Sequence, residues 1–100
     1  MTAPKDADAL ESSLEDPAPP PGLVGPVEAL WHAARGEWDR AHRLVQDDAS
    51  AAASLVHAWL HRLEGDLPNA DYWYRRAGVE PGRGELQTEW REIADRLLAQ

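Results

Sequence analysis

Two histidines, His57 and His61, lie four residues apart in the stretch HAWLHRLEGDLPNADYWYRRAG, and Glu64 follows three residues later. In an α-helix this spacing places all three side chains on one face. Imidazole and carboxylate groups are donors that Zn²⁺ accepts, so this face could hold a metal ion or contact a small ligand. The pattern is not H-E-x-x-H, however, and a bare H-x-x-x-H pair is common by chance. We therefore predict packed or hydrogen-bonded histidines with no metal bound.

Other catalytic chemistry has no positive support in the sequence. The chain contains no cysteine, which excludes a thiolate nucleophile and a thiolate zinc site. Its serines, Ser12, Ser13, Ser50 and Ser54, lack the context of a nucleophile elbow. Neither a phosphate-binding loop nor a dinucleotide fingerprint is present. The sequence therefore predicts a protein that is not an enzyme and carries no cofactor.

Aromatic and arginine side chains follow the histidines in the stretch YWYRRAG. Arginines at this point favour the negative C-terminal end of a helix, and arginine with tyrosine is also a composition enriched at protein interfaces. His32 occupies the position in an earlier hairpin that His61 occupies in this one. The candidate binding surface therefore comprises His32, His57, His61, Glu64, Tyr72, Arg75 and Arg76.

Five amphipathic helices are expected to position these side chains. Apolar residues recur at helical spacing between Pro26 and Gly36 and over about 37–46, 51–64, 67–77 and 85–98. Asp48 or Ser50 can cap the helix expected over about 51–64 and Asp66 the next one, while Gly36, Gly65 and Gly78 are suited to end helices. Each predicted helix carries one tryptophan, expected in the core: Trp31, Trp38, Trp59, Trp73 and Trp90. No segment alternates with the period of a strand, so the predicted class is all-α.

An internal repeat organises four of these helices. The segment ALWHAARGEWDRAHRLVQ (29–46) aligns without a gap with AWLHRLEGDLPNADYWYR (58–75), pairing His32 with His61 and Gly36 with Gly65. Helix, glycine turn and helix, with a small residue after the turn, resembles the tetratricopeptide repeat. The offset here is 29 residues, shorter than that family's 34, and only two units exist. The chain also resembles short, uncharacterised bacterial proteins with the pattern HR-EGD--NA-YWYRRAG, from which no activity transfers.

The tetratricopeptide resemblance implies two antiparallel helical hairpins, with the fifth helix as a cap. Stacked hairpins would leave a shallow groove between their first helices, carrying His32, His57 and His61. The leading hypothesis is a non-catalytic module that binds a protein or peptide partner, or a second copy of the chain. The alternative is a small-ligand or metal-binding protein that uses the His57/His61 face.

Residues 1–25 have a different composition from the rest. Aliphatic residues are sparse and DPAPPPG favours extended backbone, so this part is predicted to be a disordered acidic tail and residues 26–100 a single helical domain. The formal charge of −8, without a basic stripe, argues against a nucleic-acid partner. No apolar run is long enough to cross a membrane and no signal peptide is evident, so a cytoplasmic location is expected.

Overall fold

The computed structural model describes residues 3–23 and 25–99, and within these ranges the chain is helical with no strand. It contains six helices: α1 (Ala7–Ser12), α2 (Gly25–Ala34), α3 (Trp38–Val45), α4 (Ala51–Leu63), α5 (Leu67–Ala77) and α6 (Leu86–Leu98). A 3₁₀ turn, Ser13–Glu15, continues α1. The predicted all-α class is therefore confirmed. The predicted number of five helices is wrong, because an additional helix forms in the N-terminal segment.

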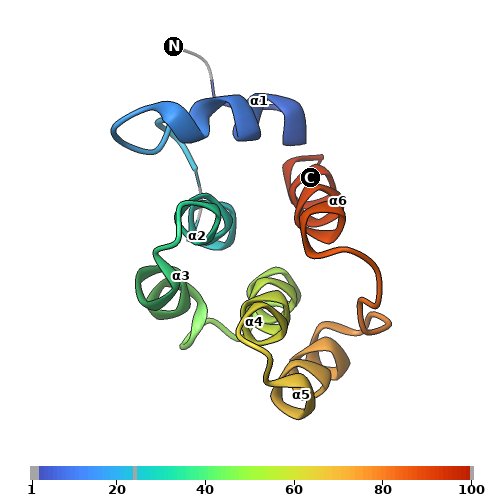
Figure 1. Ribbon diagram of the computed structural model, residues 1–100. Helices are drawn as coiled ribbons and strands as arrows, with labels where there is room; N and C mark the ends of the chain where they lie inside the picture. Colours follow the sequence, from blue (N-terminus) through green and yellow to red (C-terminus); the bar gives the residue numbers. More distant parts are fainter. Residues whose placement is uncertain (1–2, 24, 100) are drawn as a thin grey trace.

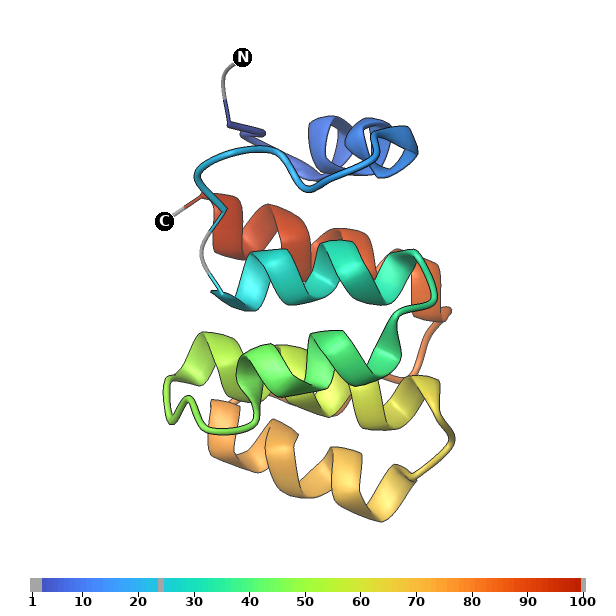
Figure 2. The same cartoon turned by 90° about the vertical axis from the view of Figure 1, so that its left-hand side faces the viewer.

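The helices surround a core shared by α2, α4 and α6. Helix α2 packs along α3, α4 packs along α5, and α6 returns to contact both α2 and α4 (Figure 1). Viewed from the side, the helices form successive layers that run from α1 through α2 and α6, then α3 and α4, to α5 (Figure 2). None of the helices in the described ranges is long and apolar enough to span a membrane.

Glycine turns and polar caps set the ends of the central helices. Gly36, Gly65 and Gly78 adopt positive φ angles of 82°, 89° and 76°, the left-handed conformation that ends a helix. The side chains of Ser50 and Asp66 accept hydrogen bonds from the first-turn amides of α4 and α5. These turns and caps are where the sequence predicts them, because glycine and capping residues act through local geometry.

The C-terminal helix packs against α2 and α4 through two tryptophan contacts. The Trp90 indole of α6 is fully buried and donates to the Leu30 carbonyl of α2 at 2.9 Å. The Trp59 indole of α4 donates to the Leu86 carbonyl of α6 at 3.1 Å. His57 and His61, which the predicted groove would carry, are instead buried on the side of α4 that faces α3 and α5.

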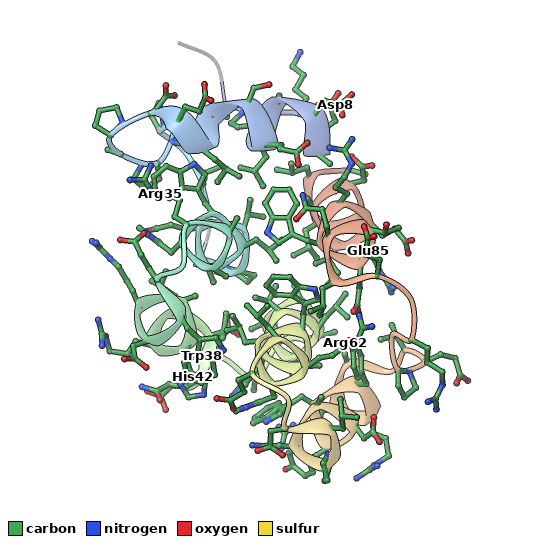
Figure 3. The ribbon with its side chains drawn as sticks, in the orientation of Figure 1. Asp8, Arg35, Trp38, His42, Arg62 and Glu85 are labelled. Carbon is green, nitrogen blue, oxygen red and sulfur yellow. The ribbon has the colours of Figure 1, made fainter. Side chains whose placement is uncertain are left out.

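The N-terminal segment is folded against the domain, in contrast to the predicted disordered tail. Ala7 and Leu10 of α1 are fully buried, and α1 packs on α6. The Ala7 amide donates to Asp95 at 2.7 Å, and Arg91 of α6 pairs with Glu11. Figure 3 shows α1 lying over α6. A six-residue helix is unstable alone, so these tertiary contacts supply the stabilisation that its composition does not indicate.

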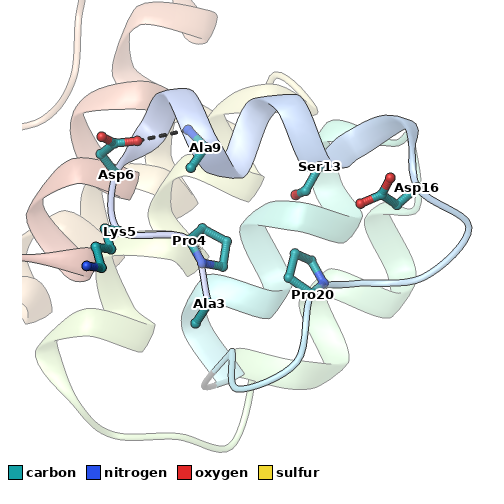
Figure 4. A pocket seen from close by; sticks show the side chains of 8 residues that line it. All are labelled: Ala3, Pro4, Lys5, Asp6, Ala9, Ser13, Asp16 and Pro20. Atoms are coloured by element: carbon teal, nitrogen blue, oxygen red, sulfur yellow. Dashed lines mark hydrogen bonds between the residues drawn. The ribbon is translucent and has the colours of Figure 1, made fainter. Parts of the chain in front are cut away.

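Further contacts hold the chain that leaves α1. Trp31 donates to the Ser13 hydroxyl at 3.1 Å, and the Arg35 guanidinium donates to backbone carbonyls of Leu14 and Asp16. An open hollow of about 460 Å³ lies within this segment (Figure 4). Its lining comes entirely from residues 3–20. It is therefore a gap inside the N-terminal fold, and it includes none of the predicted site residues.

Candidate functional site

The predicted histidines lie where three helices meet. His57 and His61 are buried on the side of α4 that faces α3 and α5, one helical turn apart. His42 of α3 joins them, so that one ring nitrogen from each of the three residues lies within 4.8 Å of the others. Trp38 and His42 lie next to each other on α3 (Figure 3). We call His42, His57 and His61 the histidine cluster.

The rings of the histidine cluster are in direct contact. The Nε2 atoms of His42 and His57 are 2.9 Å apart, and one of them donates to the other. The ring centroid of His61 is 4.8 Å from that of His57 and 5.4 Å from that of His42. Imidazole nitrogens from two helices thus converge on one small volume.

Two tryptophans fix the orientation of these rings. Trp38 stacks on His42 with centroids 4.8 Å apart and an interplanar angle of 10°. Trp73 of α5 stacks on His57 at 3.8 Å and 15°. The Trp38 indole N–H also donates to the Leu60 carbonyl of α4 at 2.8 Å, which ties α3 to α4. Because Trp38 holds the ring of His42 and Trp73 holds the ring of His57, both histidine rings have little rotational freedom.

A carboxylate orients the third ring. His61 Nδ1 lies 2.7 Å from the Oε1 atom of Glu64, and its Nε2 atom lies 3.4 Å from the Asn69 side-chain amide. An ionised carboxylate only accepts hydrogen bonds, so the proton sits on Nδ1. In the neutral ring, Nε2 therefore keeps a lone pair.

Burial favours the uncharged form of the other two rings. It lowers the pKa of His57 to about 4, and the neighbouring rings of His42 and His61 contribute in the same direction. The pKa of His42 is also lowered, first by burial and then by His61. Both imidazoles are consequently neutral near pH 7. Neutral imidazole nitrogen is a hydrogen-bonding group and a ligand for transition metals.

The aromatic residues continue onto the surface of α5. Tyr72 is exposed, and its hydroxyl accepts a hydrogen bond from Arg76 at 3.1 Å. The Arg76 guanidinium also lies over the ring of Trp73, 5.2 Å from its centroid. Arg75 is exposed on the same helix. Through Trp73, this arginine–tyrosine surface is adjacent to the histidine cluster.

The structure separates His32 from the other predicted site residues. Its Nδ1 atom lies 2.9 Å from Glu37 and its Nε2 atom 3.2 Å from Glu28, both within the first hairpin. Its position matches that of His61 in the repeat, and both rings are oriented by a nearby glutamate. His32 is bonded on both ring nitrogens, so we assign it a structural role.

His42 is the member of the cluster that sequence reasoning missed. It does not repeat, because its counterpart at the 29-residue offset is Asp71. A signal was present: Trp38 and His42 are four residues apart, which places both on the same face of α3. The inward direction of that face becomes evident only when α3 is packed on α4.

Comparisons with protein-family models, curated proteins and solved structures find no match to this chain. Its function must therefore be argued from the site.

Proposed function

We propose that this chain is a non-catalytic, tetratricopeptide-like helical module that binds a protein or peptide partner through the outer surface of its second hairpin. This surface, the α5 surface, comprises Leu63, Leu67, Tyr72, Arg75 and Arg76. One observation carries the proposal. The large apolar side chains exposed in the described residues are Leu63, Leu67 and Tyr72, at 38%, 57% and 44%, and all three lie on this hairpin.

The position of α5 supports this assignment. Helix α5 forms the last layer of the molecule and packs mainly on α4, which leaves its outer side uncovered (Figures 1 and 2). Exposed tyrosine and arginine side chains on such a helix are of the types enriched among the anchor residues of protein interfaces. Arg75 and Arg76 form no ion pair within the described part of the chain.

Shallow hollows flank the α5 surface on both sides. One, of about 230 Å³, is lined by Trp73, Arg76 and the loop between α3 and α4. The other, of about 280 Å³, has a mixed apolar, basic and acidic lining of Arg62, Leu67, Asp71, Pro81, Gly82 and Arg83. An apolar anchor in one hollow and an acidic side chain beside the arginines would use both features. The partner we propose is therefore a peptide segment that combines apolar and acidic residues.

Selection from a random peptide library tests this proposal. Full-length protein is immobilised, enriched peptides are synthesised, and their dissociation constants are measured by fluorescence anisotropy. We expect enriched peptides to bind the Tyr72→Ala/Arg76→Ala double variant at least about tenfold more weakly than wild type, because two central contacts are lost.

The matched control is Arg40→Ala, which removes an exposed arginine from α3. This variant should bind like wild type. The proposal fails if no peptide is enriched above background, or if the double variant retains wild-type affinity. Analytical ultracentrifugation of the protein alone measures its molecular mass in solution. A dimer would indicate that a second copy of the chain occupies the surface.

A further inference from the structure

We propose that the histidine cluster is a binding site for a divalent transition-metal ion of the zinc and copper class, with His42, His57 and His61 as its protein ligands. This site is independent of peptide binding by the α5 surface. It revises the expectation from the sequence, where the His57/His61 pair alone argues against a metal. The reason is His42, which the packing of α3 on α4 adds as a third imidazole.

The nitrogen positions are close to those a metal requires. Zn²⁺ lies about 2.0–2.1 Å from each histidine nitrogen, so tetrahedral donors stand about 3.3 Å apart. The Nε2 atoms of His42 and His57 are 2.9 Å apart, and the His61 donor lies within 4.8 Å of both other donors. His57 and His61 share one face of α4, one turn apart, so both can face an ion that His42 approaches from α3.

The surroundings of the cluster are those of a built site. The stacked rings of Trp38 and Trp73 hold His42 and His57 in place. Glu64 accepts from the Nδ1 atom of His61, and metal-binding histidines commonly pair with a carboxylate in this way. Two independent features, convergent nitrogens and an orienting carboxylate, thus occur together.

The hydrogen bond inside the cluster shows which tautomers a metal would require. In the absence of metal, one Nε2–H donates to the other Nε2. For both nitrogens to bind a metal, each neutral ring must carry its proton on Nδ1. The Nδ1 atom of His57 has no hydrogen-bond partner among the described residues that would exclude this tautomer.

The donor set determines which ions fit. Three neutral imidazoles suit zinc, copper, nickel and cobalt, whereas Mg²⁺ and Ca²⁺ prefer oxygen ligands. Glu64 is bonded to His61, so three protein ligands leave a coordination position for water or another donor. Binding of Zn²⁺, but not of Mg²⁺, is therefore the expected behaviour.

Calorimetric titration of metal-free full-length protein with Zn²⁺ tests the site. We expect one ion per chain with a dissociation constant near or below about 1 µM. His42→Ala should weaken binding by more than about 100-fold, because a ligand is lost, and Glu64→Gln by about 10–100-fold. The matched control is His32→Ala, which removes the histidine outside the cluster and should leave affinity unchanged. Circular dichroism establishes that each variant remains helical.

If a variant does not fold, nuclear magnetic resonance of the wild-type protein still tests the site. Zinc should shift the ¹⁵N resonances of the ring nitrogens of His42, His57 and His61 and leave those of His32 in place. The proposal is overturned if wild type binds zinc only at millimolar concentration, if His42→Ala binds like wild type, or if His32→Ala loses as much affinity as His42→Ala. It is also overturned if zinc shifts all four histidines equally, which indicates adventitious surface binding.

Discussion

His57 shows how the environment of one residue sets its chemistry. It is buried between Trp73 of α5 and the rings of His42 and His61, so its charged form is disfavoured. The sequence identifies His57, His61 and Glu64 as neighbours because helical spacing is a local property. It does not identify His42, whose approach depends on the packing of α3 against α4. Residue-level prediction therefore recovers the contacts within a helix and misses those between helices.

The buried His57 makes stability depend on pH in the metal-free protein. An unfolded histidine has a pKa of about 6.5, and in the folded protein burial lowers that of His57 to about 4. The unfolded state therefore binds more protons between these values, so stability rises with pH. The contribution of His57 is fully present above pH 6.5 and is lost as the pH falls towards 4. It amounts to about 3 kcal/mol.

Urea unfolding at pH 7.5, 5.5 and 4.5 in the presence of a chelator measures this effect. His57→Phe keeps an aromatic ring against Trp73 and removes the titrating group, so its free energy of unfolding should fall less between pH 7.5 and 4.5. The difference between the two slopes is the contribution assigned to His57. An equal slope in wild type and His57→Phe would show that this residue is not held neutral by the fold.

Helix α1 is the element that composition describes least well. Its aliphatic content is low, yet Leu10 is fully buried and Arg91 of α6 pairs with Asp8 and Glu11. Composition indicates how much apolar surface a segment can bury. Whether its few apolar residues are buried depends on the helix that packs against them. The five longer helices, in contrast, follow from periodicity, caps and glycine turns. The sequence therefore predicts their existence and approximate bounds.

Substitution of Leu10 tests whether α1 is part of the fold. Leu10→Ala should lower the free energy of unfolding by about 2–4 kcal/mol, since a fully buried leucine is lost. Urea unfolding gives the value. The control is Ser12→Ala, at an exposed position of the same helix, which should change stability by less than about 0.5 kcal/mol. If Leu10→Ala has no effect, the N-terminal segment does not dock as described.

The loop between α5 and α6 passes close to a buried polar contact made by Glu89. Glu89 of α6 accepts hydrogen bonds from Tyr74 of α5 and Arg62 of α4, and burial raises the pKa of the Tyr74 hydroxyl. A Cβ atom at Gly82 would lie 2.4 Å from the Glu89 carboxylate. Any side chain at this position must displace Glu89 from its two partners.

Gly82→Ala should therefore lower the free energy of unfolding by about 1–3 kcal/mol, the range for a buried polar group that loses its partner. Gly84→Ala is a matched control two residues away, because a Cβ atom there meets nothing within 4 Å. Thermal unfolding of the two variants gives the comparison. Equal melting temperatures would indicate that Glu89 moves aside without loss of its contacts.

At the scale of the whole molecule, the two proposed sites lie away from the core. Helices α2, α4 and α6 form that core, and α1 packs on α6. Helices α3 and α5, which pack with α4 around the histidine cluster, lie on the other side of α4 from α6 (Figure 1). Sequence pattern predicts the hairpins but not the placement of α6, because that placement depends on long-range contacts such as Trp90 with Leu30.

The central claim is that ligands approach the α5 surface and not the α2–α4 face. The direct measurement is a ¹H–¹⁵N correlation spectrum of the full-length protein, titrated with a peptide selected on wild type. We expect the largest shifts at the end of α4 and along α5, including Leu63, Leu67, Tyr72 and Arg76. Shifts concentrated in α2 and α6, or in residues 3–20, would contradict the claim and place the binding site on the opposite side of the molecule.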